Sequence, residues 1–184
     1  AQLDYDSKDI RNPVSKDLKD DLKRILKIAS PSIIYTHNPA DKHDTHVAVC
    51  VAVIEALREA PIGEDPPTVY GCEVWRSLDW LPDADKVVMP VAGHENIANA
   101  LLGAHDSQIS GGKHYNRATV GRWLSNATFF DPRSKDIASK VSFAMDLSPL
   151  LQNPDLDIIE YVSGYIKRLE ADITDRLERQ IKRS

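Results

Sequence analysis

The apolar positions along the chain follow two spacings, and these predict helices and strands in alternation. After Ser15, leucines and isoleucines recur every three to four residues up to Leu26, which predicts an amphipathic helix. Residues 32–37 are mostly β-branched or aromatic, which favours a buried strand. A second helix is expected from about Asp44 to Arg58. Helix, strand, loop and helix in this order are typical of an α/β protein.

The remaining segments extend this pattern. Residues 68–75 and 86–91 predict two more strands, and residues 93–108 predict a helix. Residues 110–132 show no clear period and are expected to form a long surface loop with a short helix inside. Apolar residues at helical spacing predict a long C-terminal helix over residues 154–183, which is also a candidate surface for a homo-oligomer.

Length and composition narrow the class of protein. A chain of 184 residues with 42% hydrophobic residues is enough for one core, so a single domain over residues 1–184 is expected. The net charge is −5, and the basic residues alternate with acidic ones, so nucleic acid is not an expected partner. Cys50 and Cys72 are far apart and are interpreted as buried thiols. With no apolar run long enough for a membrane span and no leader pattern, a cytoplasmic protein is expected.

Five ionisable side chains gather where the strand at 32–37 meets the helix at 44, and open α/β sheets bind ligands at such strand ends. They are His37, Asp41, His43, Asp44 and His46. His46 is in register with the apolar stripe of the helix, and His43 lies one turn earlier, so both imidazoles are expected to point inward. A metal supported by a carboxylate would satisfy them. The alternative is that they cap the helix or bond to the backbone within the core.

The segment resembles the second metal motif of the PIG-L/LmbE-type N-deacetylases, a His-x-x-His that follows a core strand. The resemblance implies that His46 is a ligand of Zn²⁺ or another divalent metal and that His43 is catalytic, as an oxyanion stabiliser or proton donor. Between them stand Asp44-Thr45 rather than Pro-Asp, so the family's aspartate has its nearest equivalent in Asp44, one position earlier. His37 and Asp41 are expected to support the ligand or to line the pocket.

Residues 104–108, Ala-His-Asp-Ser-Gln, are similar to a second family motif, His-x-Ser-Gln. His105 is in register with Ile97 and Leu101, so it is expected to face inward and to take part in the catalytic site. Trp80 lies in a polar loop at a strand end and is expected to line a sugar pocket, because aromatic faces stack on pyranose rings.

The resemblance also implies a fold and a reaction. The fold would be a Rossmann-like three-layer sandwich with a mainly parallel sheet, of which residues 1–184 form the C-terminal part. The reaction would be zinc-dependent removal of an N-acyl group, with acetyl as the expected one, from an amino sugar or a similar conjugate. The family's first metal motif does not occur in the sequence, so a longer natural product is expected, and these residues alone are expected to be inactive. The alternative is a non-catalytic α/β module for binding or oligomerisation that retains the fold.

Overall fold

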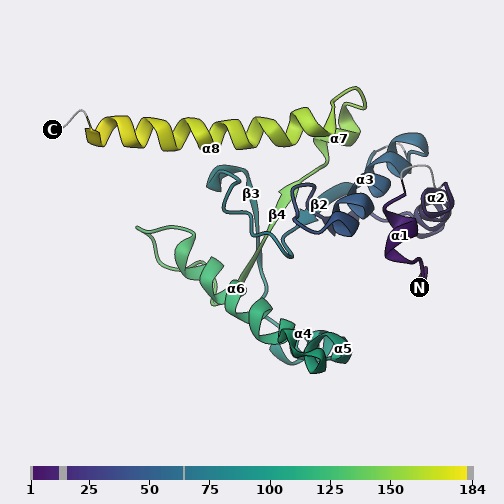
Figure 1. The fold of residues 1–184 in the computed structure, drawn as a ribbon, viewed down its shortest axis with the longest axis horizontal. Coiled ribbons are helices and arrows are strands. Elements are labelled where there is room, and N and C mark those ends of the chain that lie inside the picture. Colours follow the sequence, from purple (N-terminus) through teal and green to yellow (C-terminus); the bar gives the residue numbers. More distant parts are fainter. Residues whose placement is uncertain (1, 13–15, 64, 182–184) are drawn as a thin grey trace. The chain divides into compact units, whose positions relative to one another are not determined.

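The computed structural model describes residues 2–12, 16–63 and 65–181. It has a mixed α/β fold with a four-stranded sheet and a long C-terminal helix among these residues (Figure 1). The chain divides into two compact units, one formed by residues 1–87 with 144–184 and the other by residues 88–143. The clustered histidines all belong to the first unit.

The elements that lie wholly in the first unit are α1 (Ser7–Ile10), α2 (Asp17–Ala29), β1 (Ile33–His37), α3 (Asp44–Glu59), β2 (Thr68–Cys72), η1 (Asp83–Asp85), α7 (Pro149–Gln152) and α8 (Ile158–Ile181). Those of the second unit are α4 (Glu95–Gly103), α5 (Asp106–Gln108), η2 (Ile109–Lys113) and α6 (Tyr115–Phe129). Strands β3 (Lys86–Pro90) and β4 (Val141–Asp146) each cross the division between the units.

The strand order is β1-β2-β4-β3, and most of the pairing is antiparallel. β1 runs parallel to β2, with His37 opposite Cys72 at the end of both strands. β4 then pairs antiparallel with β2. The predicted mainly parallel sheet is therefore wrong, because β4, which the sequence pattern did not reveal, lies between β2 and β3.

Strand β1 lies at the edge of the sheet. It was expected to be buried, but Ile33 is 46% exposed and Tyr35 is 62% exposed. An edge strand has a neighbour on one side alone, so its β-branched and aromatic composition fits a strand without requiring full burial. His37, its last residue, is half-buried.

Helix α3 supplies much of the core of the first unit. Its stripe of Cys50, Val53, Ile54 and Leu57 is buried, as the sequence pattern predicted. Helix α3 contacts both α2 and β1. The other large side chains of this unit that are fully buried come from the strands and the segments that follow them: Val69, Leu78, Leu81, Met145, Leu147 and Leu150.

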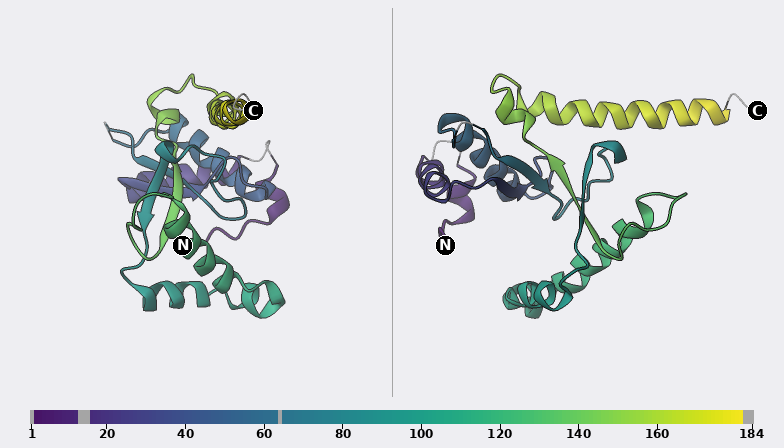
Figure 2. Two further views of the ribbon diagram at one scale, coloured as in Figure 1. Left: turned by 90° about the vertical axis from the view of Figure 1, so that its left-hand side faces the viewer. Right: turned by 180° about the vertical axis from the view of Figure 1, so that it is seen from behind.

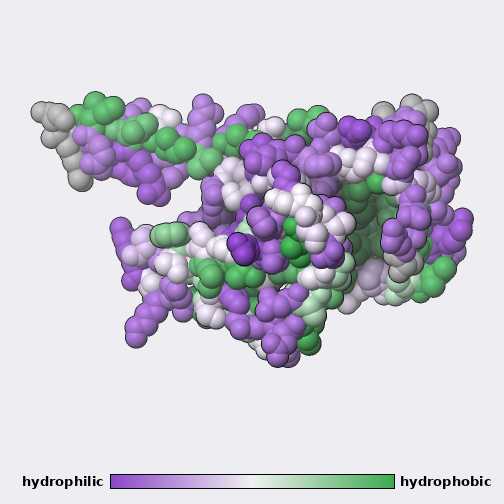
Figure 3. Space-filling model, turned by 60° about the horizontal axis from the view of Figure 1, so that its bottom comes forward, coloured by the Kyte–Doolittle hydropathy of each residue, from purple (hydrophilic) through white to green (hydrophobic). Residues whose placement is uncertain are grey.

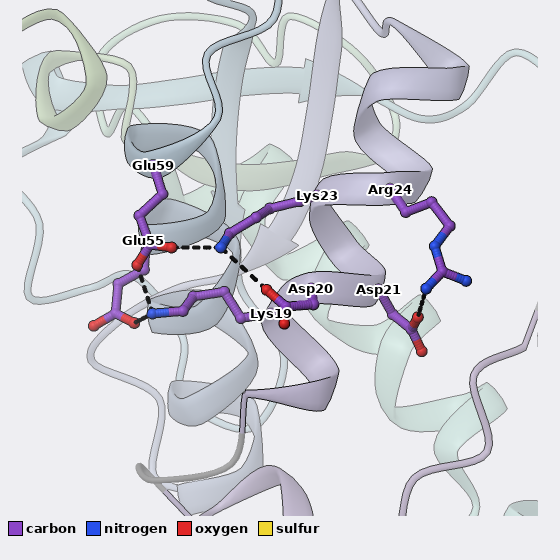
Figure 4. Close-up of polar contacts among 7 residues, drawn as sticks. All are labelled: Lys19, Asp20, Asp21, Lys23, Arg24, Glu55 and Glu59. Atoms are coloured by element: carbon purple, nitrogen blue, oxygen red, sulfur yellow. Dashed lines mark hydrogen bonds and ion pairs between the residues drawn. The ribbon is translucent and has the colours of Figure 1, made fainter.

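Ion pairs join α2 to α3 at the surface (Figure 4). Lys19 Nζ lies 3.3 Å from Glu55 Oε2 and 2.6 Å from Glu59 Oε1. Lys23 Nζ pairs with Glu59 as well, at 2.5 Å from Oε2. These contacts hold the pKa of Glu59 at about 2, chiefly through the hydrogen bond from Lys19 and then that from Lys23. These ion pairs hold the second half of α3, whereas the clustered histidines lie at and before its first turn.

The second unit is mainly helical (Figure 2). Helix α6 occupies most of the segment that was expected to be a loop, so that prediction is wrong. Its buried residues are Asn126 and Ala127, and Asn126 Nδ2 donates to the Val141 carbonyl at 3.1 Å. Few apolar contacts order this helix, which explains why its sequence shows little amphipathic period.

The long C-terminal helix is confirmed. Helix α8 begins at Ile158, four residues later than expected, and extends to Ile181; positions 182 and 183 of the predicted span lie outside the described residues. Among the helices that the structure describes, none is long and apolar enough to cross a bilayer.

Candidate metal centre

The loop between β1 and α3 is held against the end of β2 by Asn38. This side chain is fully buried; its Nδ2 donates to the Cys72 carbonyl at 3.1 Å and its Oδ1 accepts from the Ala40 N–H at 3.1 Å. The Asn38 N–H also donates to the Cys72 carbonyl. Because both ends of this side chain are bonded to backbone, the loop has a fixed path from β1 toward Asp41.

Gly71 makes room for this loop. A Cβ at position 71 would lie 3.1 Å from Asn38 Cα and 2.9 Å from Leu147 Cδ1. The first distance is to backbone, which cannot turn away as a side-chain tip can. Glycine is therefore needed in β2 for the close approach of the loop.

Asp41 is the most enclosed ionisable group of the cluster, with a side chain that is 0% exposed. Its Oδ1 accepts from the N–H groups of Lys42 at 2.6 Å and His43 at 3.3 Å. Its Oδ2 accepts from the Trp75 N–H at 3.2 Å and lies 3.3 Å from Nδ1 of His46. Burial would by itself raise the pKa of Asp41, but the hydrogen bonds from His46 and the three backbone groups outweigh it and lower the pKa. Asp41 is thus an ionised carboxylate at neutral pH.

The Asp41 carboxylate decides the tautomer of His46. An ionised carboxylate can accept hydrogen bonds but not donate them, so Nδ1 of His46 must carry the proton. The lone pair is then on Nε2. A carboxylate that orients an imidazole in this way, with the other nitrogen left for a metal, is the usual support of a metal-binding histidine. His46 is half-buried, with a side chain 20% exposed.

His37 stacks on His46. The ring centroids are 3.9 Å apart, and the ring planes differ by 3°. Burial, followed by the nearby imidazole of His46, lowers the pKa of His37 from 6.5 to about 4. His37 is therefore neutral at pH 7 and can lie face to face with His46 without charge repulsion.

His37, Asp41 and His46 together form a candidate metal-binding group. One potential ligand atom from each lies within 4.8 Å of the other two. The ring geometry distinguishes their roles, because lone pairs of two parallel, stacked imidazoles lie in separate planes and do not converge on one ion. All four hydrogen-bonding positions of the Asp41 carboxylate are also taken. As placed, Nε2 of His46 is the nitrogen available to a metal ion, and His37 would have to rotate to bind the same ion.

His43 and Trp75 extend the row of rings. The His43 ring lies 4.5 Å from that of His46, and the Trp75 ring lies 6.4 Å from that of His43, with interplanar angles of 22° and 27°. His43 is exposed, so the prediction that it points inward is wrong; as the N-cap of α3 it has an extended backbone that turns the side chain toward the surface. Trp75 is half-buried. His43 is thus a solvent-accessible imidazole beside His46.

The other predicted residues are placed as follows. Asp44 is exposed at the first position of α3. Trp80 lies in the loop after β2, and its buried indole N–H has no hydrogen-bond partner among the described residues. His105 belongs to the second unit and is exposed, with Ile97 58% and Leu101 65% exposed on the helix just before it. Its expected burial is wrong, and its place in a catalytic site stays a prediction.

The sequence pattern did not predict three residues that shape this site: Asn38, Gly71 and Trp75. Trp80 was the predicted pocket tryptophan, yet it is the Trp75 N–H that bonds to Asp41 and the Trp75 ring that adjoins His43. One signal was available, since Gly71 interrupts a run typical of a strand, and glycine within a strand often marks a close backbone approach.

The sequence matches no known family model, and no curated protein sequence matches it significantly. Solved structures that resemble the chain include 4-carboxy-2-hydroxymuconate hydratase GalB from Pseudomonas putida, with a TM-score of 0.49 and 16% identity over 74% of this chain and 61% of that chain. The conserved protein TT1542 from Thermus thermophilus has a TM-score of 0.49 and 18% identity over 77% of this chain and 63% of that chain. The chain thus spans less than two thirds of each of these proteins.

Proposed function

We propose that these residues carry part of the site of a metal-dependent N-deacetylase. In this site Nε2 of His46 binds a divalent cation, with zinc as the expected metal. The observation that supports this is the pair formed by His46 and the buried Asp41 carboxylate, which leaves one imidazole nitrogen with a fixed lone pair. The resemblance of the segment to the PIG-L/LmbE-type motif supplies the reaction. Histidine nitrogen, the donor that these residues offer, is one that zinc accepts readily.

In amide hydrolysis, water adds to the acyl carbon, the C–N bond breaks and a proton passes to the leaving amine. A bound zinc ion would polarise the acyl oxygen and lower the pKa of water. His43 is the exposed imidazole beside His46, so it is the residue assigned to donate the proton to the amine or a hydrogen bond to the developing oxyanion. Asp44, the exposed neighbour of His43, is the candidate base within these residues.

An amino sugar is the substrate class that Trp75 supports. Its indole continues the row of rings beyond His43 and is half-buried, so part of the ring is accessible. An aromatic face next to the reacting amide would stack on a pyranose ring and hold it in place. Trp75 therefore replaces Trp80 as the residue that we assign to sugar binding.

Acetate release from N-acetylglucosamine by the natural gene product that contains these residues tests the proposal. We expect His46→Ala to abolish it and His43→Gln to lower kcat by about 10²–10⁴-fold. Trp75→Ala should mainly raise KM. The matched control is His94→Ala, at an exposed histidine of the second unit, which should leave activity unchanged. Equal acetate release by wild type and His46→Ala would refute the assignment.

A non-catalytic module is the second candidate, and the stacked rings of His37 and His46 favour it. In this arrangement the lone pairs of the two imidazoles do not converge, so an ion would have one histidine ligand, and a single histidine binds zinc weakly. Under this alternative neither metal nor deacetylation would be found, whereas the fold and the surfaces of α8 would be kept.

A further inference from the structure

Helix α8 carries exposed apolar side chains along one side (Figure 3). Ile173, Leu177 and Ile181 are between 47% and 71% exposed. Apolar contact has no preferred direction, so a stripe of this kind can pack on many surfaces. An imidazole is more restrictive, because its two nitrogens bind only at the edge of the ring. The orientation of the clustered histidine rings therefore limits what they can bind more closely than the apolar side of α8 limits its contacts.

The ring of His46 lies between the rings of His37 and His43. The centroid of the His37 ring is 3.9 Å from that of His46, and the two planes differ by 3°. The centroid of the His43 ring is 4.5 Å away, and its plane is inclined by 22°. Rings at these distances would overlap each other if both lay on the same face of His46, because non-bonded carbon atoms come no closer than about 3.5 Å. His37 and His43 therefore cover opposite faces.

Asp41 holds one edge of the same ring. Its Oδ2 lies 3.3 Å from Nδ1 of His46, and the carboxylate is itself enclosed. With both faces stacked and the Nδ1 edge held, the edge that carries Nε2 is the open one. The side chain of His46 is 20% exposed, in agreement with a single open edge. A metal ion bound to Nε2 must lie in the plane of this ring, so the plane of His46 sets the position of the metal.

His37 is the better anchored of the two stacking rings. It is the last residue of β1, opposite Cys72 of β2, and it is half-buried. The next residue, Asn38, is fully buried, and its side-chain amide bonds to backbone at both ends. His43, in contrast, is exposed and precedes α3. The strand and the loop therefore hold the His37 ring, and that ring limits how far His46 can turn.

We propose that His37 is a positioning residue, which holds the ring of His46 in the metal-binding orientation by stacking on it and does not bind the metal. Because the two rings are nearly parallel, the lone pair of His37 points along a plane that does not contain an ion at Nε2 of His46. Asp41 thus selects the tautomer of His46, and His37 fixes the plane of its ring. This inference rests on the proposed metal-binding role of His46.

Two substitutions separate the ring of His37 from its nitrogens. His37→Phe keeps a flat ring and removes both nitrogens, whereas His37→Asn keeps a polar side chain and removes the ring. In the natural gene product that contains these residues, His37→Phe should bind zinc as wild type does in a calorimetric titration. His37→Asn should bind zinc about 10–100-fold more weakly, as is usual when the support of a metal-binding histidine is lost. Equal weakening in both variants, or none in His37→Asn, would overturn the proposal.

The matched controls are His94→Phe and His94→Asn, the same two changes at an exposed histidine of the second unit, which should leave zinc affinity unchanged. Circular dichroism should show that each variant is folded. Cobalt in place of zinc reports on the ligands directly, because its visible absorption changes when a ligand is lost. The cobalt spectra of wild type and His37→Phe should coincide. A different spectrum in His37→Phe would identify His37 as a ligand and overturn the proposal.

Carbon relaxation of the His46 ring, measured by NMR in the metal-free protein, tests the stack without zinc. The ring should be as rigid in His37→Phe as in wild type and more mobile in His37→Asn. A His46 ring that stays equally rigid in His37→Asn would overturn this proposal alone and leave the metal assignment standing. Absence of zinc binding in wild type would instead overturn the metal assignment, and this proposal with it.

Discussion

Oδ2 of Asp41 lies 3.3 Å from Nδ1 of His46 and accepts the Trp75 N–H at 3.2 Å, so one buried oxygen joins the loop after β1, the start of α3 and the segment after β2. Asp41 therefore has both a structural and a chemical role. The same carboxylate that closes the loop also determines which nitrogen of His46 can bind a metal.

Asp41→Asn is expected to lower zinc affinity by about 10–100-fold, because the amide can no longer hold the His46 tautomer as a carboxylate does. The change keeps the shape of the side chain but turns one oxygen into an N–H donor that faces other donors. Calorimetric zinc titration measures the affinity. Asp44→Asn, an exposed aspartate three residues later, is the control and should bind zinc as wild type does. Equal zinc affinities of Asp41→Asn and Asp44→Asn would show that the Asp41 carboxylate does not orient His46.

The stability of the metal-free chain should fall as the pH drops from about 6.5 to about 4. The pKa of His37 is about 4 in the folded chain and 6.5 when unfolded. Between these values the unfolded chain binds more protons, so acid favours unfolding. Allowing for solvent around the half-buried ring, the loss should be about 1–2 kcal/mol. The lowered pKa of Asp41 lies below its unfolded value of 3.8, so its own contribution is lost at more acidic pH.

Urea unfolding with a chelator present, at pH 7 and pH 4.5, measures this loss. His37→Gln cannot gain a proton, so its stability should change less between the two pH values than that of wild type. An equal change in both proteins would show that His37 titrates normally and is not held by burial against His46.

Gly71→Ala should destabilise the first unit by about 1–3 kcal/mol, because the new Cβ would press on backbone at Asn38 Cα. Gly164→Ala is the matched control. Nothing lies within 4 Å of a Cβ at position 164, in the interior of α8, so alanine there should stabilise by about 0.5–1 kcal/mol. If the backbone at Asn38 approaches Gly71 closely, the urea midpoint of unfolding should fall in Gly71→Ala and rise in Gly164→Ala. Two shifts in the same direction would contradict it.

Part of the fold followed from the sequence because the signal was local. In α3 and α8 the apolar residues repeat at helical spacing over consecutive turns, and both helices were predicted. Strand β4 was missed because Ser142 and Ala144 break its run of large apolar residues, although the strand is largely buried. Since β4 separates β2 from β3, that single omission produced the wrong sheet. Helix α6 was missed because it buries only Asn126 and Ala127, so its sequence shows little amphipathic period.

The residues of the candidate site were likewise predicted where they lie close together in the sequence and missed where they do not. His37, Asp41, His43 and His46 lie within ten positions, so their grouping was visible in the sequence. Trp75 comes from a segment about 30 positions later, and a backbone hydrogen bond brings it to Asp41. A backbone N–H carries no sequence signature. That Trp75 adjoins the cluster therefore follows from tertiary structure alone.

The most direct test of the metal centre is equilibrium dialysis against zinc for the natural gene product that contains these residues, as wild type, His46→Ala and His94→Ala. The account predicts about one zinc per chain for wild type and His94→Ala and none for His46→Ala. Equal zinc in all three, or none in wild type at saturating zinc, would contradict the assignment of His46 as the ligand.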